Sequence, residues 1–600
     1  MISLLNAIYK LGKLYLKKEE LDEIEVLLDS KNIGTVLSIN LIEDEVGNFT
    51  YEKISQEDYD EHKKRLYLYK KGSSNGANIS PSSLITDIEK TFNKKFLKWF
   101  KNNQHSNDYF KRCYDFFEEN NEIILNDLNE IYNTVDVGKT NVLLTLKISK
   151  NNQYYYLGDI DLFNESFKKT SFEKFYKKGS KKIKGVSCCF LCEEHKTVYG
   201  LVSSAVGFAF STPEKIGNVP GNNILNQWKL LPICGDCAIY LVAGKNFIEK
   251  YLNFKEFGLS YYVIPNFLFD SKEGFNKLYD VLKSLETGKS QNYKDEFYIE
   301  SKLSRLVKKI DDVVEFKFLF YESSNSAFNI LAYVESIIPS WLSKLYNSQY
   351  EIANFNFLNE SNLKNIFGNK HTGNFIKLIN KNEKFYKCNE YDWFKKFLRD
   401  FIFSFSKKFY IDLVADIISN KKLDYKFLMS RFIDKIRSNW RNNENYALKM
   451  SVLKSLMLLI LINKLNLIKG VDNMNVNSEF SLESLLNSPD KKASFLLGVL
   501  TKRLLNKQYT ELGSNPFYNK LWGLSLDQKK IKKLYPMVIN KLREYNTTYL
   551  KLEENISKNL INSEGNWKLN RDETSYFFVL GFTMPYFKKN NNEKEVDLNE

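Results

Sequence analysis

Two CxxC pairs, Cys189-Phe-Leu-Cys192 and Cys234-Gly-Asp-Cys237, constrain the fold of this chain more than any other feature. Zinc takes four soft ligands in a tetrahedron, and two residues between cysteines let both thiolates of a pair face one ion. The 41 residues between the pairs are too many for a compact ribbon, so we expect the site to close a small insert. Four thiolates leave no position for water, so we predict a structural Zn²⁺.

The neighbouring residues leave the ligand set partly open. Cys188 could take the place of Cys189, and His195 could replace a thiolate. Buried or redox-active thiols are the alternative to metal, although a thioredoxin-like site needs only one CxxC pair. Five of the seven cysteines lie between positions 188 and 237. This clustering argues against a disulfide framework, and we expect the chain in the reducing cytoplasm.

The sequence shows no export or membrane segment. The N-terminal stretch MISLLNAIYKLGKLYL lacks a small-residue cleavage site and predicts an amphipathic helix. Its apolar residues at helical spacing are Leu4, Leu5, Ile8, Leu11 and Tyr15. The most apolar stretch, Leu456 to Ile462, lies between Lys454 and Lys464 and is too short to span a bilayer.

The patterns along the 600 residues predict a multidomain α+β protein. We expect an α/β region at 1–184, the zinc insert at 185–245, an α/β to helical middle region at 246–440, a C-terminal helical bundle at 441–590 and a polar tail at 591–600. Residues Ile33 to Ile42 predict a strand. The alternation from Val142 to Ile148, the pair Asn151-Asn152 and the run Gln153 to Ile160 predict a hairpin with a two-residue turn.

The chain has a formal net charge of +14, which favours an anionic partner, nucleic acid before a membrane surface. The loop Lys70 to Ser82 is rich in Gly, Ser, Asn and Lys, and we predict DNA contacts by Lys70, Lys71, Asn75 and Asn78. An ordinary surface loop is the alternative.

A second basic segment runs from Lys168 to Lys184 and contains one acid, Glu173. It is either a solvated linker or an arm that contacts phosphates and stacks bases. The aromatic residues of the segment are Phe172, Phe175 and Tyr176, and its candidate nucleic-acid contacts are Lys177, Lys178, Lys181 and Lys182.

The segments that resemble catalytic or nucleotide-binding motifs do not match the full patterns of those motifs. Gly138-Lys139-Thr140 and Gly288-Lys289-Ser290 lack the earlier glycine of a phosphate-binding loop. Gly72 to Gly76 matches the letters of a nucleophile elbow, but a polar loop follows it in place of a helix. None of the four histidines is followed by Asp, so an HD-type nuclease centre lacks support. Asp159 and Asp161 share a face of the predicted strand and could bind Mg²⁺, or they are surface carboxylates.

An ordered set of segments carries a family resemblance. The loop YLYKKGSSNGANISPSSLITD precedes the basic-aromatic helix TFNKKFLKWF, and a CxxC pair follows with Val198-Tyr199-Gly200 after it. Phe208-Ala209-Phe210, Ser211 to Lys215 and the second pair in LLPICGDCAIYLVAGKNFIEKYL come next. Then come Ile264 to Phe267, Ile338 to Ser340 and FLLGVLTKRLLNKQ. This order resembles the large subunit of type I-B CRISPR Cascade complexes, while residues 345–440 add no support.

The resemblance implies a non-enzymatic subunit of a crRNA-guided antiviral complex. Such a subunit lies beside the crRNA 5′ handle, reads the PAM in double-stranded target DNA, supports R-loop formation and presents the complex to a helicase-nuclease. Its C-terminal helical domain contacts the displaced strand and the small subunits, beside the backbone subunits of the complex. In this family a small subunit can arise from an internal start, for which Met429 and Met450 are the in-frame candidates.

Two other function classes stay open. One is a zinc-dependent nuclease or nucleic-acid-modifying enzyme that uses Asp159 or Asp161. The other is a stand-alone zinc-containing nucleic-acid-binding protein. The sequence does not give the PAM, the stoichiometry, the use of an internal start, or which basic residues touch RNA and which touch DNA.

Overall fold

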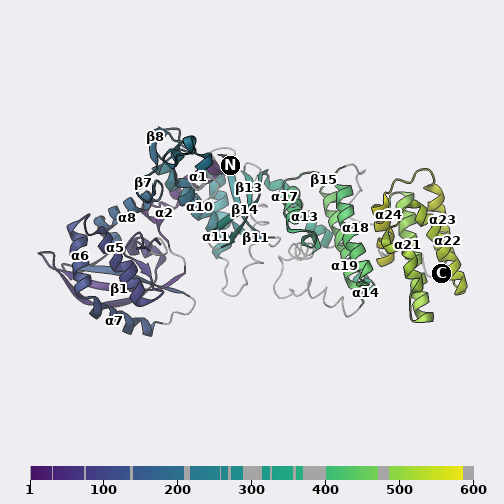
Figure 1. The fold of residues 1–600 in the computed structure, drawn as a ribbon, viewed down its shortest axis with the longest axis horizontal. Helices are drawn as coiled ribbons and strands as arrows, with labels where there is room; N and C mark the ends of the chain where they lie inside the picture. The colour runs from purple at the N-terminus through teal and green to yellow at the C-terminus, as the bar shows by residue number, and fades with distance from the viewer. Residues whose placement is uncertain are drawn as a thin grey trace. The chain divides into compact units, whose positions relative to one another are not determined.

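The computed structural model describes residues 2–29, 32–72, 76–135, 140–207, 216–256, 259–267, 272–287, 314–324, 327–353, 355, 358, 360–368, 401–469 and 485–584. The chain is a mixed α+β protein with sheets in its N-terminal half and a helical C-terminal region, which confirms the predicted fold class (Figure 1). It divides into two compact units. Unit 1 comprises Met1–Leu252 and Ser323–Asn329, and unit 2 comprises Asn253–Glu322 and Ile330–Glu600.

The main sheet of unit 1 has the strand order β2-β1-β4-β3, with β5 paired to β4. β1 runs parallel to β4 and antiparallel to β2. The bounds are β1 (Ile33–Glu43), β2 (Phe49–Asp58), β3 (Ser83–Leu84), β4 (Asn141–Lys150) and β5 (Gln153–Tyr156). The predicted first strand and the hairpin are present, and both Asn151 and Asn152 have the positive φ of a type I′ turn.

The second strand of that hairpin is shorter than predicted. It ends at Tyr156, because Leu157–Asp159 forms a 3₁₀ helix, η3, in which the Asp159 carboxylate accepts from the Tyr156 amide at 2.9 Å. Asp161 is the first residue of α8 (Asp161–Glu173). The prediction that Asp159 and Asp161 share one strand face is therefore wrong.

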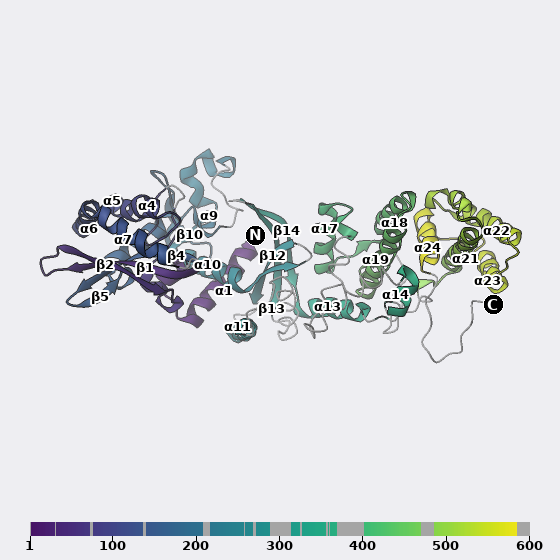
Figure 2. The ribbon, with the colours of Figure 1, turned by 90° about the horizontal axis from the view of Figure 1, so that it is seen from below.

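Helices cover one face of the unit 1 sheet (Figure 2). They are α4 (Ile88–Thr91), α5 (Lys98–Asn103), α6 (Asp108–Glu119) and α7 (Asn121–Thr134). A π-helical segment, η2 (Phe92–Leu97), joins α4 directly to α5. The buried rings of Phe92, Phe96 and Phe100 follow one another at 5.5 and 5.4 Å, so this helix is anchored by an aromatic row.

The N-terminal helix α1 (Ile2–Glu19) packs against α10 (Gly235–Tyr251). The two backbones meet at Gly12 and Gly244: a Cβ on Gly12 would lie 2.6 Å from the Gly244 nitrogen. Leu4, Leu5, Ile8 and Leu11 are buried, which confirms the predicted amphipathic helix.

Unit 2 begins with a sheet of strand order β11-β12-β13-β14. Its strands are β11 (Asn253–Glu256), β12 (Leu259–Phe267), β13 (Val314–Ser324) and β14 (Ala327–Ile337). The helices that follow are α13 (Pro339–Ala353), α14 (Glu360–Phe367), α17 (Lys407–Ile418), α18 (Tyr425–Arg441) and α19 (Asn445–Lys464). One further helix, α11 (Lys272–Thr287), lies between β12 and β13 in the chain.

The C-terminal bundle consists of α21 (Pro489–Leu512), α22 (Gln528–Glu544), α23 (Leu550–Asn562) and α24 (Arg571–Thr583). α21 begins after Ser488 with Pro489 in its first turn, and a capping box of Asn570 and Glu573 begins α24. The predicted boundary at residue 440 falls at the end of α18, whereas the predicted tail, 591–600, lies outside the described residues.

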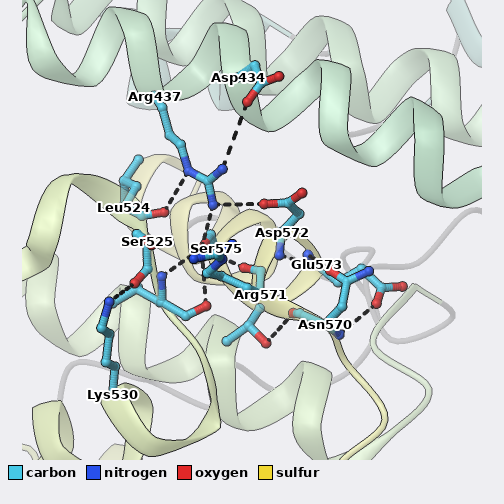
Figure 3. A network of polar contacts seen from close by, with 12 residues as sticks. Asp434, Arg437, Leu524, Ser525, Lys530, Asn570, Arg571, Asp572, Glu573 and Ser575 are labelled. Atoms are coloured by element: carbon cyan, nitrogen blue, oxygen red, sulfur yellow. Dashed lines mark hydrogen bonds and ion pairs between the residues drawn. The ribbon is translucent and has the colours of Figure 1, made fainter.

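A polar network joins α18 to the bundle (Figure 3). Arg437 contacts Asp572, in the first turn of α24, at 2.9 Å, and its Nε donates to the Leu524 carbonyl at 3.0 Å. Ser575 accepts from the Leu526 amide at 2.9 Å and lies beside the same guanidinium. The Arg437 side chain is only 14% exposed, so this is a largely buried and well-satisfied ion pair.

The apolar run Leu456 to Ile462 lies within α19, which is longer than the run itself. α19 is 20 residues long, and by length and composition it could cross a membrane. Two thirds of its apolar window is buried inside unit 2, however, as in a core helix. Leu456 to Ile462 are all buried, which explains why this helix has no polar face.

Candidate metal centre and nucleic-acid-binding residues

The first CxxC pair lies in the turn between β8 (Lys184–Cys188) and β9 (His195–Tyr199). The Cys189 amide donates to the Glu194 carbonyl at 2.8 Å, and the Glu193 amide donates to the Cys189 carbonyl at 2.9 Å. Glu193 adopts a positive φ, which lets the chain reverse sharply around the cysteines. The turn therefore presents Cys189 and Cys192 on its inner side.

The second pair lies where β10 (Ile233–Cys234) meets the start of α10. Cys234 pairs with Val198 of β9, so the sheet β10-β9-β8 carries both pairs. Cys237 follows in the first turn of α10. The Phe172 ring lies against Gly235, where a Cβ would be 3.0 Å from it. The glycine thus allows α8 to pack beside the second pair.

The four sulfur atoms form one cluster. The Sγ atoms of Cys189, Cys192, Cys234 and Cys237 all lie within 4.8 Å of one another, and the Cys192–Cys234 separation is 3.8 Å. A tetrahedron with zinc–sulfur bonds of about 2.3 Å has sulfur–sulfur edges of about 3.8 Å. The Cys234 amide also donates to Cys189 Sγ at 3.3 Å. The cluster therefore has the donor set and the size to hold a metal ion.

The structure settles the choice between adjacent cysteines. Cys188 is exposed, and its thiol donates to the Glu193 carbonyl at 3.0 Å, outside the cluster. In β9, His195 stands directly opposite Cys188, and it is likewise not part of the cluster. The four sulfur atoms that lie close enough together to hold a metal ion are thus those of the predicted set, Cys189, Cys192, Cys234 and Cys237.

The thiols influence one another's charge. Hydrogen bonds from the Cys234 and Cys237 thiols lower the pKa of Cys189. The same bonds raise the pKa of Cys237, and they raise that of Cys234 to about 11. Burial raises the pKa of Tyr9 in α1, and charge at Cys237 and Cys192 adds to this effect. The Cys189 thiol is therefore the one of these three thiols that loses its proton most readily, and its neighbours stabilise the resulting charge through hydrogen bonds.

The basic arm after α8 is a small hairpin. Lys177–Lys178 (β6) pairs with Lys181–Lys182 (β7), and all four side chains are exposed. The aromatic residues of this segment serve packing: Phe175 is buried, and Tyr176 stacks on Tyr199 at 5.1 Å. The lysines can reach phosphates, whereas these two rings are already engaged inside unit 1.

The structure distinguishes the predicted residues of the 70–82 loop. Lys71 is exposed. Lys70 is half-buried, and its ammonium group donates a hydrogen bond to the Leu27 carbonyl at 2.5 Å. The Asn78 side chain accepts from the Gly72 amide at 3.0 Å and donates to Ser82 and Ser83. Its amide group therefore braces the loop. Asn75 lies outside the described residues, as do Phe208 to Lys215.

The lysines that the sequence prediction missed belong to neighbouring elements. Lys95 of η2 donates to the Gly76 carbonyl at 2.6 Å, and Lys174, after α8, donates to the Lys71 carbonyl at 3.3 Å. Lys98 begins α5 and lies near Lys95. The basic-aromatic stretch TFNKKFLKWF was the available signal, although it did not reveal which side of the helix faces the loop.

Comparisons with known proteins place the whole arrangement in one family. Models of the CRISPR-associated protein TM1802 match in chain order: its N-terminal domain at residues 4–169, its central domain at 186–337 and its C-terminal domain at 396–596. A search of curated proteins gave no match. The four-cysteine cluster falls inside the central match. Because three consecutive domain models together match most of its length, this chain belongs to the TM1802 family of CRISPR-associated proteins.

Proposed function

We propose that this chain is the non-catalytic large subunit of a type I-B CRISPR interference complex. The observation that carries the proposal is the match of all three TM1802 domains in order along the chain. In this role the chain binds the crRNA 5′ handle and target DNA in the cytoplasm. It also reads the PAM, supports R-loop formation beside the other subunits and recruits the helicase-nuclease.

The charge of the chain supports this role. In RNA-guided recognition, base pairing supplies the sequence specificity, so the protein needs phosphate contacts and a short readout of duplex DNA. A net charge of +14 provides for phosphate contacts. Lys71 and the exposed hairpin lysines are surface cations in unit 1 that can make them.

We further propose that the cysteine cluster holds a structural Zn²⁺. Four thiolates are a ligand set that selects zinc or iron–sulfur chemistry, and the sulfur separations match a single tetrahedral ion. With all four positions filled by the chain, the ion cannot bind a substrate water. Its contribution is to fix β8, β9 and β10 to the start of α10.

Co-purification tests the complex. The tagged full chain is expressed with its neighbouring genes, and the eluate is examined by mass spectrometry for zinc, small RNA and co-purifying subunits. The expected result is one zinc per chain, a uniform small RNA and repeated backbone subunits. An eluate that holds the chain alone would favour a stand-alone nucleic-acid-binding protein.

A cleavage assay tests the alternative that the chain is an enzyme. Purified chain is incubated with DNA or RNA and added divalent metal. Metal-dependent cleavage that disappears in Asp159→Asn or Asp161→Asn would replace the non-catalytic proposal. We expect no cleavage, because the Asp159 carboxylate is engaged in capping η3 and Asp161 begins a helix.

A further inference from the structure

The 3₁₀-helical segment η9 (Pro516–Leu524), between α21 and α22, ends in a strained left-handed turn. Trp522, Gly523 and Leu524 have φ values of 45°, 59° and 61°. Glycine adopts such values freely, whereas a bulky side chain strains the backbone there. A strained backbone persists only where the surrounding contacts hold it, and it is found most often at ligand-binding and catalytic sites. The turn is therefore a candidate part of a binding site.

Two cations from different helices hold this turn (Figure 3). The Arg437 Nε atom donates to the Leu524 carbonyl at 3.0 Å, and the Lys530 ammonium donates to the Ser525 carbonyl at 2.7 Å. Lys530 also lies over the Trp522 ring, 5.9 Å from the ring centroid. The Leu524 side chain is buried, whereas Trp522 is half-buried. The turn thus keeps Leu524 in the core and leaves part of Trp522 at the surface.

The two cations differ in how far carboxylates offset their charge. Arg437 pairs with Asp572 at 2.9 Å and lies 3.9 Å from Asp434. The Asp527 carboxylate caps α22 by accepting from the backbone amide of Lys530. The Lys530 ammonium itself forms no ion pair within the described part of the chain, and a bond to a neutral carbonyl leaves its charge intact. An anion at this turn would therefore meet a cation that no carboxylate offsets.

A cavity of about 390 Å³ opens at the end of α18, the helix that supplies Arg437. Its lining residues recur every three or four positions and so share one face of the helix. They are Asp434, Arg437, Ser438, Arg441 and Asn442. Arg441 is exposed and forms no ion pair with any described residue. A guanidinium group presents its donors in a fixed fork that matches a phosphate, so the cavity can admit a phosphate group at Arg441.

Stacked aromatic rings bring the end of α18 beside η9. The Trp440 and Tyr518 rings lie 4.4 Å apart, and the Tyr518 hydroxyl donates to the Trp440 carbonyl at 3.1 Å. Arg441 follows Trp440 directly in the chain, and Lys520 follows Tyr518 by two residues. Lys520 is exposed and, like Arg441, has no ion-pair partner among the residues that the structure describes. Two unpaired cations thus flank the contact between α18 and η9.

We propose that Arg441, Lys520 and Trp522 form a binding site for single-stranded nucleic acid, with Arg437 and Lys530 as positioning residues. This inference rests on the proposed function and names a surface of unit 2 that contacts an unpaired strand. Arg441 and Lys520 contact phosphates, and the Trp522 ring stacks on a base. An aromatic face combined with cations binds single strands without reading their sequence, because every base has a flat face.

The test separates charge from stacking in the full chain. Arg441→Gln/Lys520→Gln removes two charges of the site, and Lys551→Gln/Lys558→Gln removes the same charge from exposed positions of α23. Trp522→Gly removes the ring at a position where glycine accepts the left-handed backbone, and Trp522→Phe keeps an aromatic ring. Each protein is titrated against short single-stranded DNA and short single-stranded RNA at several salt concentrations. Thermal unfolding establishes that all proteins are folded.

We expect Arg441→Gln/Lys520→Gln to bind about fivefold more weakly, with the slope of log affinity against log salt reduced by about 1.4, or about 0.7 for each lost phosphate contact on a single strand. The α23 control should keep both quantities close to the wild-type values. Trp522→Gly should bind about tenfold more weakly with an unchanged salt slope, because stacking involves no charge, and Trp522→Phe should retain most of the affinity. A loss confined to one probe identifies DNA or RNA as the ligand.

Three outcomes would overturn the inference. If the wild type binds and the site variants match it in affinity and salt slope with both probes, the site is wrong while the proposed function stands. If the α23 control loses as much affinity as the site variant, net charge rather than this site governs binding. If the wild type binds neither probe, the inference fails. Co-purification of small RNA decides the proposed function independently of these results.

Discussion

Gly12 of α1 and Gly244 of α10 lie backbone to backbone: a Cβ on Gly244 would fall 2.1 Å from the Ile8 carbonyl, and one on Gly12 would fall 1.8 Å from the Tyr240 carbonyl. α10 is also the helix that carries Cys237 in its first turn. The close approach therefore ties the N-terminal helix to the helix that contributes Cys237 to the cysteine cluster.

The Gly244→Ala variant tests this contact. The neighbouring atoms are main chain, so the helices must separate, and we expect a loss of about 2 kcal/mol in the free energy of unfolding. Denaturant titration measures it. The matched control is Gly217→Ala, since an added Cβ there meets nothing within 4 Å. Equal stability of the two variants would contradict the contact.

The cysteine cluster makes an equally direct prediction. Cys234→Ser should lose zinc and lower the melting temperature, because metal binding to a structural site contributes to folding. Metal analysis by mass spectrometry, with calorimetry, measures both. Cys188→Ser is the control, since its thiol lies outside the cluster. Loss of zinc from the control, or its retention by Cys234→Ser, would rule out the assigned ligands.

Lys70 predicts a pH dependence of stability. Burial lowers the pKa of Lys70 to about 8, below its ordinary value near 10.4. The unfolded state therefore binds more protons between these values, so the contribution of Lys70 to stability rises as pH increases through that window. Denaturant titrations from pH 7 to pH 10 should show the wild type gaining stability relative to Lys70→Met. Parallel curves would show that Lys70 keeps an ordinary pKa.

The contacts of Arg437 lead us to expect that Arg437→Ala and Asp434→Ala differ in stability. Arg437→Ala leaves the Asp572 carboxylate and the Leu524 carbonyl without their partner, and we expect a loss of about 2 to 3 kcal/mol. Asp434→Ala removes a contact of 3.9 Å from a side chain that is 62% exposed, and it should change stability by less than about 0.5 kcal/mol. The prediction is falsified if the two losses are alike in chemical denaturation.

The sequence predicted those features that depend on local spacing. The CxxC pairs, the apolar residues of α1 and the Asn151-Asn152 turn all follow from patterns within a few residues. The glycine contact of α1 with α10 could not be predicted, because it depends on how two distant helices cross. The role of Asn78 was also hidden, since the letters of a loop do not reveal whether an amide faces solvent or its own backbone. The lysines near the loop come from three separate elements, and only the fold brings them together.

The internal start offers a last prediction, because the structure places both candidate methionines inside helices. Met429 is buried in α18, and Met450 lies in α19. A product that begins at Met429 loses the Asp424 cap of α18 but keeps Arg437 and its contact with Asp572. A product that begins at Met450 loses α18 and this contact.

We therefore expect the 429–600 polypeptide to unfold cooperatively and at a higher temperature than 450–600, as measured by circular dichroism. Arg437→Ala should narrow that difference without removing it, because the longer product retains the ion pair to α24 and also the buried Phe432, Ile436 and Trp440 of α18. In cells, the full-length gene with Met429→Leu should lose any short product that starts there, while the conservative change in volume leaves α18 packed. A short product that persists in this variant and disappears in Met450→Leu would assign the start to α19.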